Sequence, residues 1–243
     1  MTRNIKLTIE YDGSNFLGWQ IQKKGRTVQG ELQKTLEKLL RQKITLIGAG
    51  RTDTGVHALG QVANFKTTSK LETGKILKAL NNLLPKDIVI KKVQEVNLDF
   101  NARFKAKSRV YRYRIYLGKT AILRKLRWEV FQPLDIKKMK QALRLIKGYH
   151  NFSNFGRKGE DLHDFKCQIL KAKGEENGSE VTFEIEANRF LRGMVRSLVG
   201  SLVEIGRGRL GLNEFGKMLS ADGHKKAIRK APASGLYLVK VKY

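Results

Sequence analysis

The chain has 243 residues, 41% of them hydrophobic, which is enough for a packed core and excludes wholesale disorder. Lysine and arginine number 49 against 22 aspartate and glutamate, and the formal net charge of +27 favours a nucleic acid partner over an anionic membrane surface. No apolar run approaches the roughly 20 residues of a membrane span, and the N-terminus lacks the apolar core of a signal peptide. The single cysteine, Cys167, excludes an intramolecular disulfide. We therefore expect a cytoplasmic protein that binds nucleic acid.

The first half of the chain shows alternating strand and helix patterns. Apolar and polar residues alternate over 4–11, which predicts a half-buried strand. Apolar residues at helical spacing predict helices over 28–40, with Thr27 as the N-cap, and over 76–84, before Pro85. Further strands are expected at 45–47, 61–66 and 88–96. This order, β-α-β-β-α-β, is typical of a ferredoxin-like unit.

The second half repeats the order of elements without detectable sequence identity to the first. Strands are expected at 109–117, 165–172, 181–187 and 236–242, a turn at 174–178, and helices at 136–146 and 190–205. The sequence thus predicts an α+β fold of two ferredoxin-like βαββαβ halves in tandem, residues 1–106 and 107–243, with a central basic cleft between them.

A stretch without acidic residues extends from residue 101 to residue 128 and contains ten basic residues. Tyr111, Tyr113 and Tyr116 lie among them. Basic residues interleaved with aromatic ones can contact phosphates and stack on bases. An ordinary strand with core tyrosines and outward charges explains the pattern equally well, and we expect two of the three tyrosines to be core residues.

The run GAGRTDTGVHA at residues 48–58 places one carboxylate, Asp53, in a glycine-rich turn. It is not a phosphate-binding P-loop, which ends in Gly-Lys-Ser/Thr, because here Gly50 is followed by Arg51 and Thr52. A dinucleotide fingerprint would have a glycine where Asp53 stands. A metal-dependent nuclease would need several carboxylates or histidines around its ions, and too few lie near this run.

Asp53 has a structural and a functional interpretation. An aspartate in such a turn often only accepts hydrogen bonds from backbone amides. However, Arg51 is two residues away and favours the ionised carboxylate, and the glycines allow another backbone to approach closely. An ionised, accessible carboxylate in a basic cleft suits a nucleophile or a general base. His57 either orients this loop or touches RNA, with packing in the turn favoured. His163 and Cys167 alone do not make a metal site, and we expect none.

The run 50–58 resembles the signature of the TruA family of tRNA pseudouridine synthases. Three further blocks agree with this resemblance: YDGSNFLGWQIQ at 11–22, RVYRY at 109–113, and residues 190–200 followed by APASGLY at 231–237. The blocks are spread along the sequence, so the resemblance extends over essentially the whole chain. The chain departs from the family at Asn154, where known members carry serine, and over 118–132. Both departures bear on the choice of tRNA.

The resemblance implies an enzyme that isomerises uridine to pseudouridine at positions 38, 39 and 40 in the anticodon stem-loop of tRNA, as a homodimer and without cofactor or metal. It also implies that the two ferredoxin-like halves share an antiparallel sheet. It implies that Asp53 is the catalytic residue and Tyr111 the substrate-binding tyrosine. Arg51 and Arg196 match the basic partners of the aspartate.

Pseudouridine formation breaks the N1–C1′ bond, turns the base and rejoins it at C5. Asp53 either adds to the sugar or base, or removes a sugar proton, and the sequence leaves both routes open. We expect Arg196 to pair with Asp53 and favour its charged form, Tyr111 to stack on the base or assist proton loss at C5, and Arg51 to fill the gap left by the extruded base. Two alternatives remain: an RNA-binding module, since βαββαβ is also the RRM order, and a pseudouridine synthase acting on other RNA.

Overall fold

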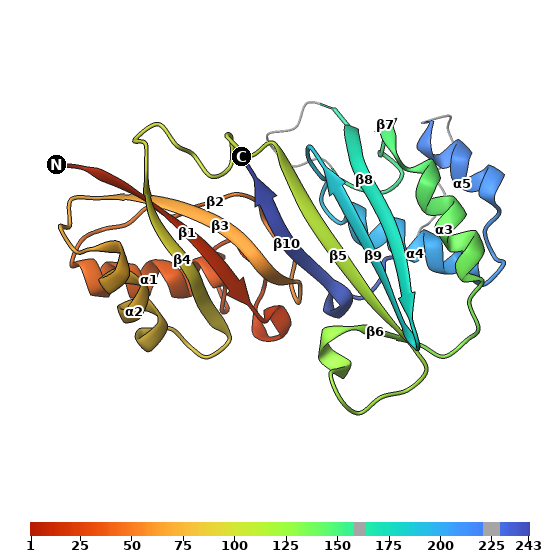
Figure 1. Cartoon of the computed structure of the whole chain (residues 1–243), viewed down its shortest axis with the longest axis horizontal. Helices are drawn as coiled ribbons and strands as arrows, with labels where there is room; N and C mark the ends of the chain where they lie inside the picture. Colours follow the sequence, from red (N-terminus) through yellow and green to blue (C-terminus); the bar gives the residue numbers. More distant parts are fainter. Residues whose placement is uncertain (158–163, 221–228) are drawn as a thin grey trace. The chain divides into compact units, whose positions relative to one another are not determined.

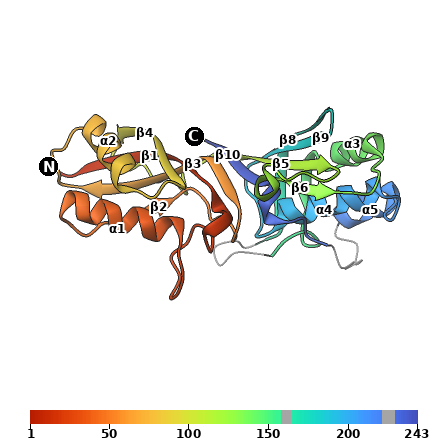
Figure 2. The same cartoon turned by 90° about the horizontal axis from the view of Figure 1, so that it is seen from below.

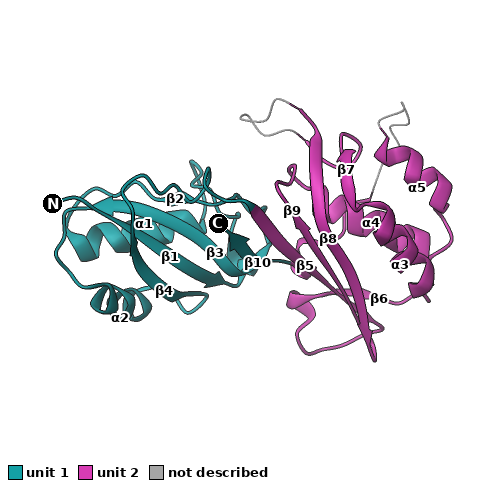
Figure 3. Ribbon diagram, turned by 45° about the horizontal axis from the view of Figure 1, so that its top comes forward, with its two compact units in different colours: residues 1–107, 237–243 teal, residues 108–236 magenta. Residues whose placement is uncertain are grey.

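The computed structural model describes residues 1–157, 164–220 and 229–243 (Figure 1). Two compact units are distinguished within it, one formed by Met1–Lys107 with Tyr237–Tyr243 and the other by Ser108–Leu236 (Figure 3). Each unit combines mostly antiparallel strands with α-helices, so the fold is mixed α/β. Within the described ranges, no helix has both the length and the apolar character of a membrane span.

The first unit contains strands in the order β4-β1-β3-β10, with β2 paired to β3. β1 is antiparallel to both neighbours, whereas β10 lies parallel to β3, with Tyr237 opposite His57. This pairing explains why the last strand groups with the first unit. The strand bounds are β1 Arg3–Tyr11, β2 Ile47–Gly48, β3 His57–Thr67, β4 Ile88–Val96 and β10 Leu236–Lys242.

Two helices, α1 (Val28–Leu40) and α2 (Thr73–Leu83), complete the first unit. As expected, the Thr27 side chain caps α1, where it accepts a hydrogen bond from the Gly30 amide. α2 ends one residue before the Leu84-Pro85 pair, because the residue before a proline is driven out of the helical conformation. The two helices contact each other, and Figure 2 shows α1 lying along one side of the strands.

The second unit contains strands in the order β5-β9-β8-β7, with the short β6 parallel to β5. Helix α4 is apolar nearly all round and is buried in the core of this unit, in contact with α3. The bounds are β5 Ser108–Leu117, β6 Trp128–Val130, α3 Ile136–Leu145, β7 Gly148–Asn151, β8 Lys166–Asn177, β9 Glu180–Ala187, α4 Met194–Gly206 and α5 Leu212–Leu219.

The predicted elements differ from the observed ones at several boundaries. α4 begins at Met194 and not at 190, because Gly193 has φ 76°, which no α-helix allows. The turn between β8 and β9 lies at Gly178 (φ 56°), so β8 continues through the expected turn region. Periodicity did not predict β6, β7 and α5, which have three, four and eight residues and are too short to show a clear period.

The two faces of β5 and β9 differ in polarity. On one face, Tyr113 lies opposite Phe183, and both side chains are fully buried. On the other face, Arg112 pairs with Glu184 at 2.9 Å, and Arg114 pairs with Glu180 at 2.6 Å. These two arginines of the acid-free stretch are therefore neutralised within the protein.

The Arg114–Glu180 pair makes the stability of the second unit depend on pH. The hydrogen bond from Arg114 lowers the pKa of Glu180 from its ordinary 4.5, so the stabilisation is complete above pH 4.5 and is lost as the pH falls through the lowered value. We expect Glu180→Gln to lower Tm at pH 7 by about 2–4 °C, and this difference from the wild type to shrink in acid. Thermal melts from pH 7 to pH 3 measure it, with Glu176→Gln, which changes an exposed carboxylate of the same unit, as the control. A difference that is constant over this range would contradict the assignment.

Candidate active site

The Asp53 loop, residues 49–56, connects β2 to β3 and packs against the segment 12–19 that follows β1. The Trp19 amide donates to the Thr52 carbonyl at 3.1 Å, and the Gly55 amide donates to the Phe16 carbonyl at 3.3 Å. The segment 12–19 contains one short 3-10 helix, Gly13–Asn15, and the two segments satisfy backbone groups of each other. The Asp53 loop is therefore held on both sides of Asp53.

Two glycines of the segment 12–19 make this packing possible. A Cβ at Gly13 would overlap the Val56 carbonyl, and a Cβ at Gly18 would overlap the Thr52 carbonyl. Gly18 also has φ 93°, which favours glycine. The close backbone approach expected for the Asp53 run is thus present, but the glycines that permit it belong to the facing segment.

Buried side-chain contacts reinforce the backbone bonds. The Tyr11 hydroxyl and Thr52 Oγ1 are hydrogen-bonded at 2.7 Å. His57 is 1% exposed, stacks on Tyr237 with ring centroids 4.7 Å apart, and its Nδ1 accepts a hydrogen bond from the Gly13 amide at 3.1 Å. These contacts agree with the expected packing of His57 in the turn.

The carboxylate of Asp12 lies next to the same imidazole, with Oδ1 3.1 Å from His57 Nδ1. Asp12 Oδ1 also accepts hydrogen bonds from the amide and the hydroxyl of Ser14. Burial acts to raise the pKa of Asp12, but the two hydrogen bonds from Ser14 outweigh it and lower that pKa below 3.8. A charged Asp12 therefore closes the turn that starts the segment 12–19.

Asp53 is half-buried, between the buried Thr52 and the exposed Thr54. Its carbonyl accepts a hydrogen bond from the Val56 amide at 3.1 Å, which closes a tight turn. Arg51 is exposed in the same loop. The structure thus places Arg51 and Asp53 together on a constrained loop whose outer residues are open to a ligand.

The other two predicted site residues belong to the second unit. Tyr111 is half-buried on β5, and its ring meets Phe190 edge-on with centroids 5.0 Å apart. Arg196 lies in the first turn of α4, where its Nε donates to the Ala231 carbonyl at 2.7 Å. The Ala231 amide donates in turn to the Arg196 carbonyl, which attaches this segment to the helix.

The tyrosines of the acid-free stretch differ from the expectation that two are core residues. Only Tyr113 is fully buried, where burial strongly raises the pKa of its hydroxyl, which donates to the Pro232 carbonyl at 2.8 Å. Tyr111 and Tyr116 are half-buried, and the Arg127 guanidinium lies 4.9 Å from the Tyr116 ring centroid. Two tyrosines therefore keep part of their rings accessible.

Metal-ligating side chains do not gather in groups of three or more anywhere in the described part of the chain. Cys167 is buried, and His163 lies outside the described residues. Sequence reasoning missed the contact between Tyr11 and Thr52. The alternation over 4–11 predicted a half-buried strand that ends at Tyr11, but no local pattern indicates the partner of this side chain 41 residues away.

Comparison with known proteins identifies the family. A family model described as tRNA pseudouridine synthase matches residues 7–105 and 142–243. The chain belongs to this family. The tRNA pseudouridine synthase A of Acetivibrio thermocellus is 45% identical over 243 residues, which cover 99% of this chain and 100% of that protein. The protein of the same name from Chlorobium luteolum is 45% identical over 242 residues, 99% of this chain and 96% of its own length.

Tyr111 of this synthase lies between the two ranges that the family model matches, whereas Arg51, Asp53 and Arg196 lie within them. A solved structure, the archaeal box H/ACA sRNP Nop10–Cbf5 complex, aligns with a TM-score of 0.36 and 11% identity over 97% of this chain and 46% of that one. The sequence relationships alone assign the chain to a family of isomerases.

Proposed function

We propose that the chain isomerises uridine to pseudouridine in tRNA, at positions 38, 39 and 40 of the anticodon stem-loop, with Asp53 as the catalytic residue. The observation that carries this proposal is the half-buried Asp53 on a loop that is held on both sides, in a chain of the tRNA pseudouridine synthase family. Gly13 and Gly18 of the facing segment let the loop lie against that segment at Val56 and Thr52, so the position of Asp53 between them is constrained.

The reaction conserves all atoms and electrons of the nucleotide. The N1–C1′ bond breaks, the uracil turns, and a C5–C1′ bond forms, while C5 loses a proton and N1 gains one. Asp53 acts as the nucleophile toward the sugar or base, or as the base that takes a sugar proton. Because substrate and product are isomers, the scheme needs no oxidant, reductant or group donor.

The remaining site residues act on the same uridine in this proposal. Arg196 favours the charged form of Asp53, since a nearby cation stabilises a carboxylate. The half-buried Tyr111 stacks on the base or assists proton loss at C5. Arg51, exposed beside Asp53, occupies the gap in the base stack, because a shielded uridine must leave the stack before it can react.

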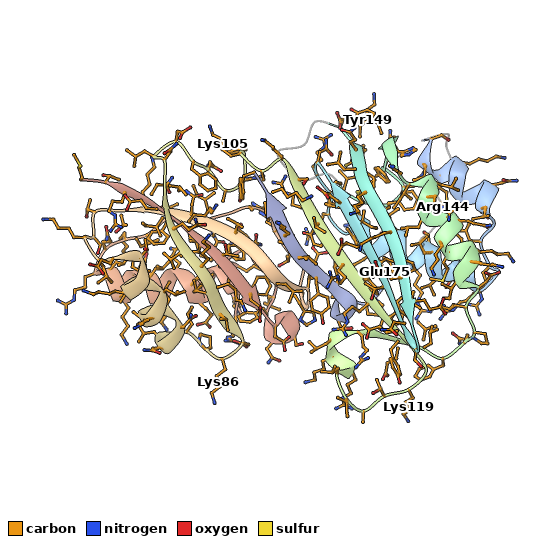
Figure 4. The ribbon with its side chains drawn as sticks, in the orientation of Figure 1. Lys86, Lys105, Lys119, Arg144, Tyr149 and Glu175 are labelled. Atoms are coloured by element: carbon orange, nitrogen blue, oxygen red, sulfur yellow. The ribbon has the colours of Figure 1, made fainter. Side chains whose placement is uncertain are left out.

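The exposed cations of the acid-free stretch supply phosphate contacts in this proposal. Arg112 and Arg114 are paired with glutamates and Lys105 is paired with Asp99, but four other basic side chains are exposed: Lys107, Lys119, Arg124 and Lys125. Figure 4 shows Lys119 extending away from the ribbon of its loop. Flexible cations of this kind bind phosphates without reading sequence.

We expect tRNA affinity to fall by about two orders of magnitude between 50 and 200 mM salt, because each phosphate contact releases a counterion. Replacing Arg124 and Lys125 by glutamine should reduce the slope of log K against log salt by about 1–2. Filter binding over a salt series measures both. Lys86→Gln, which changes an exposed lysine outside the stretch (Figure 4), is the matched control and should leave the slope unchanged. An affinity that does not depend on salt would contradict the phosphate contacts.

We further propose a cytoplasmic homodimer and two tandem ferredoxin-like halves, residues 1–106 and 107–243, that share an antiparallel sheet with a central basic cleft. The order β1-α1-β2-β3-α2-β4 in the first unit supports the first half. In the second unit, β5, α3, β8, β9 and α4 follow the same pattern up to its last strand, with β6 and β7 added. Analytical ultracentrifugation tests the dimer.

Tritium release from tRNA labelled at uridine C5 tests the function, because pseudouridine formation frees the C5 hydrogen. Mapping the product by carbodiimide-stop sequencing should place it at positions 38 to 40. Product at other tRNA positions, or on ribosomal RNA only, would replace the proposed substrate by another RNA site. Tight RNA binding without any tritium release would favour a non-catalytic RNA-binding protein.

A further inference from the structure

We infer that Tyr11 and Thr52 are positioning residues for the reaction: the hydrogen bond between their side chains sets where Asp53 presents its carboxylate. This inference rests on the catalytic role proposed for Asp53. The two hydroxyls are 2.7 Å apart in a buried setting, with Tyr11 3% and Thr52 7% exposed. Thr52 immediately precedes Asp53, so any rotation or shift of its backbone moves Asp53 directly.

Tyr11 is held by the sheet of the first unit. It is the last residue of β1, where its backbone pairs with Ala58 of β3 on one side and Ile88 of β4 on the other. Its ring lies 6.3 Å from that of Trp19. The hydroxyl is therefore a fixed point supplied by the sheet, and a site attached to regular structure is held more accurately than one held by loops alone.

Thr52 is fixed through two of its groups, since the Trp19 amide holds its carbonyl while Tyr11 holds its hydroxyl. On the far side of Asp53, the Gly55 amide is bound to Phe16. The loop is thus anchored before and after Asp53. Of these contacts, the Tyr11–Thr52 bond is made by side chains, so it can be removed without altering the backbone.

A hydroxyl pair in this place differs from an apolar pair of the same shape. Phenylalanine and valine would fill nearly the same volume, and apolar packing has no preferred direction. A hydrogen bond weakens steeply when its angle departs from linearity, so it fixes the direction of Thr52 as well as its distance. We therefore expect the bond to contribute more to the rate of reaction than to binding of tRNA.

The test is Tyr11→Phe and Thr52→Val, singly and together, measured by single-turnover pseudouridine formation at saturating enzyme. We expect the rate constant to fall roughly 10- to 100-fold in each, since a displacement of the order of 1 Å can cost about 10²-fold. The Kd for tRNA should stay within about twofold of the wild type, because the phosphate contacts are unchanged. The double variant should be no slower than the slower single variant, because both remove the same bond.

Two matched variants separate positioning from general damage. Thr52→Ser keeps a hydroxyl and should restore most of the rate. Tyr243→Phe removes another tyrosine hydroxyl bond of the first unit, the one to the Ala102 carbonyl at 3.0 Å, and should react at the wild-type rate. Melting curves for all variants establish that the assays are run well below each Tm.

Three outcomes would each overturn the inference. Tyr11→Phe could react at the wild-type rate, Tyr11→Phe or Thr52→Val could lose as much tRNA affinity as rate, or Thr52→Ser could be slow. Asp53→Asn is included in the same series. If that variant stays active, the proposed function of Asp53 fails. If it is inactive while Tyr11→Phe and Thr52→Val react normally, only the positioning role fails.

Discussion

Asp53→Asn should reduce pseudouridine formation by about 10³-fold or more while tRNA affinity stays within about twofold of the wild type. The amide has nearly the shape of the carboxylate, so the turn closed by the Asp53 carbonyl and the Val56 amide is preserved. It has no negative charge, however, and can act neither as a nucleophile nor as a base at neutral pH. Tritium release gives the rate, and filter binding with labelled tRNA gives the affinity.

A control for this variant must remove a negative charge from the same unit without touching the loop. Glu95→Gln does so, because Glu95 is an exposed residue of β4 that pairs with Arg3 at 2.8 Å. It should keep the wild-type rate. If the Asp53→Asn variant were slow only because it binds tRNA poorly, Asp53 would shape the RNA-binding surface and would take no part in the chemistry.

Gly13→Ala should both destabilise the protein and nearly abolish its activity. The added Cβ would overlap the Val56 carbonyl, and two backbones must move apart to accommodate it. We expect the free energy of unfolding to fall by about 1–3 kcal/mol, the usual cost of overpacking. Because the displaced segment is attached to the Asp53 loop at Thr52 and Gly55, and to the adjoining His57, we expect the rate to fall about 10²-fold even where the protein is folded. Urea denaturation and tritium release measure the two effects.

Gly74→Ala is the matched substitution for this experiment. Gly74 is a helical residue of α2, and a Cβ added there has no neighbouring atom within 4 Å. It should stabilise the protein by about 0.4–1 kcal/mol, because alanine restricts the unfolded chain and favours the helix. If Gly13→Ala behaved like Gly74→Ala, the close packing of the two loops would not hold in solution.

Local sequence patterns were sufficient where burial acts on one face of a regular element. The alternation of Ile5, Leu7 and Ile9 predicted β1, and all three side chains are fully buried. The helical spacing of Val28, Leu32 and Leu36 predicted α1 in the same way. Position-specific motifs, above all the run 50–58, led to the family that the comparisons show. Both kinds of signal are carried by residues close together in the sequence.

Tertiary contacts decided what lies around Asp53. The sequence by itself determined that a single carboxylate follows Arg51 in a glycine-rich turn, and that the chain is basic enough to hold RNA. Only the structure showed that Tyr11 bonds to Thr52 and that Gly13 faces Val56. Such contacts join residues about 40 positions apart. They depend on the strand register and on how two loops approach each other, and neither property leaves a periodic trace in the sequence.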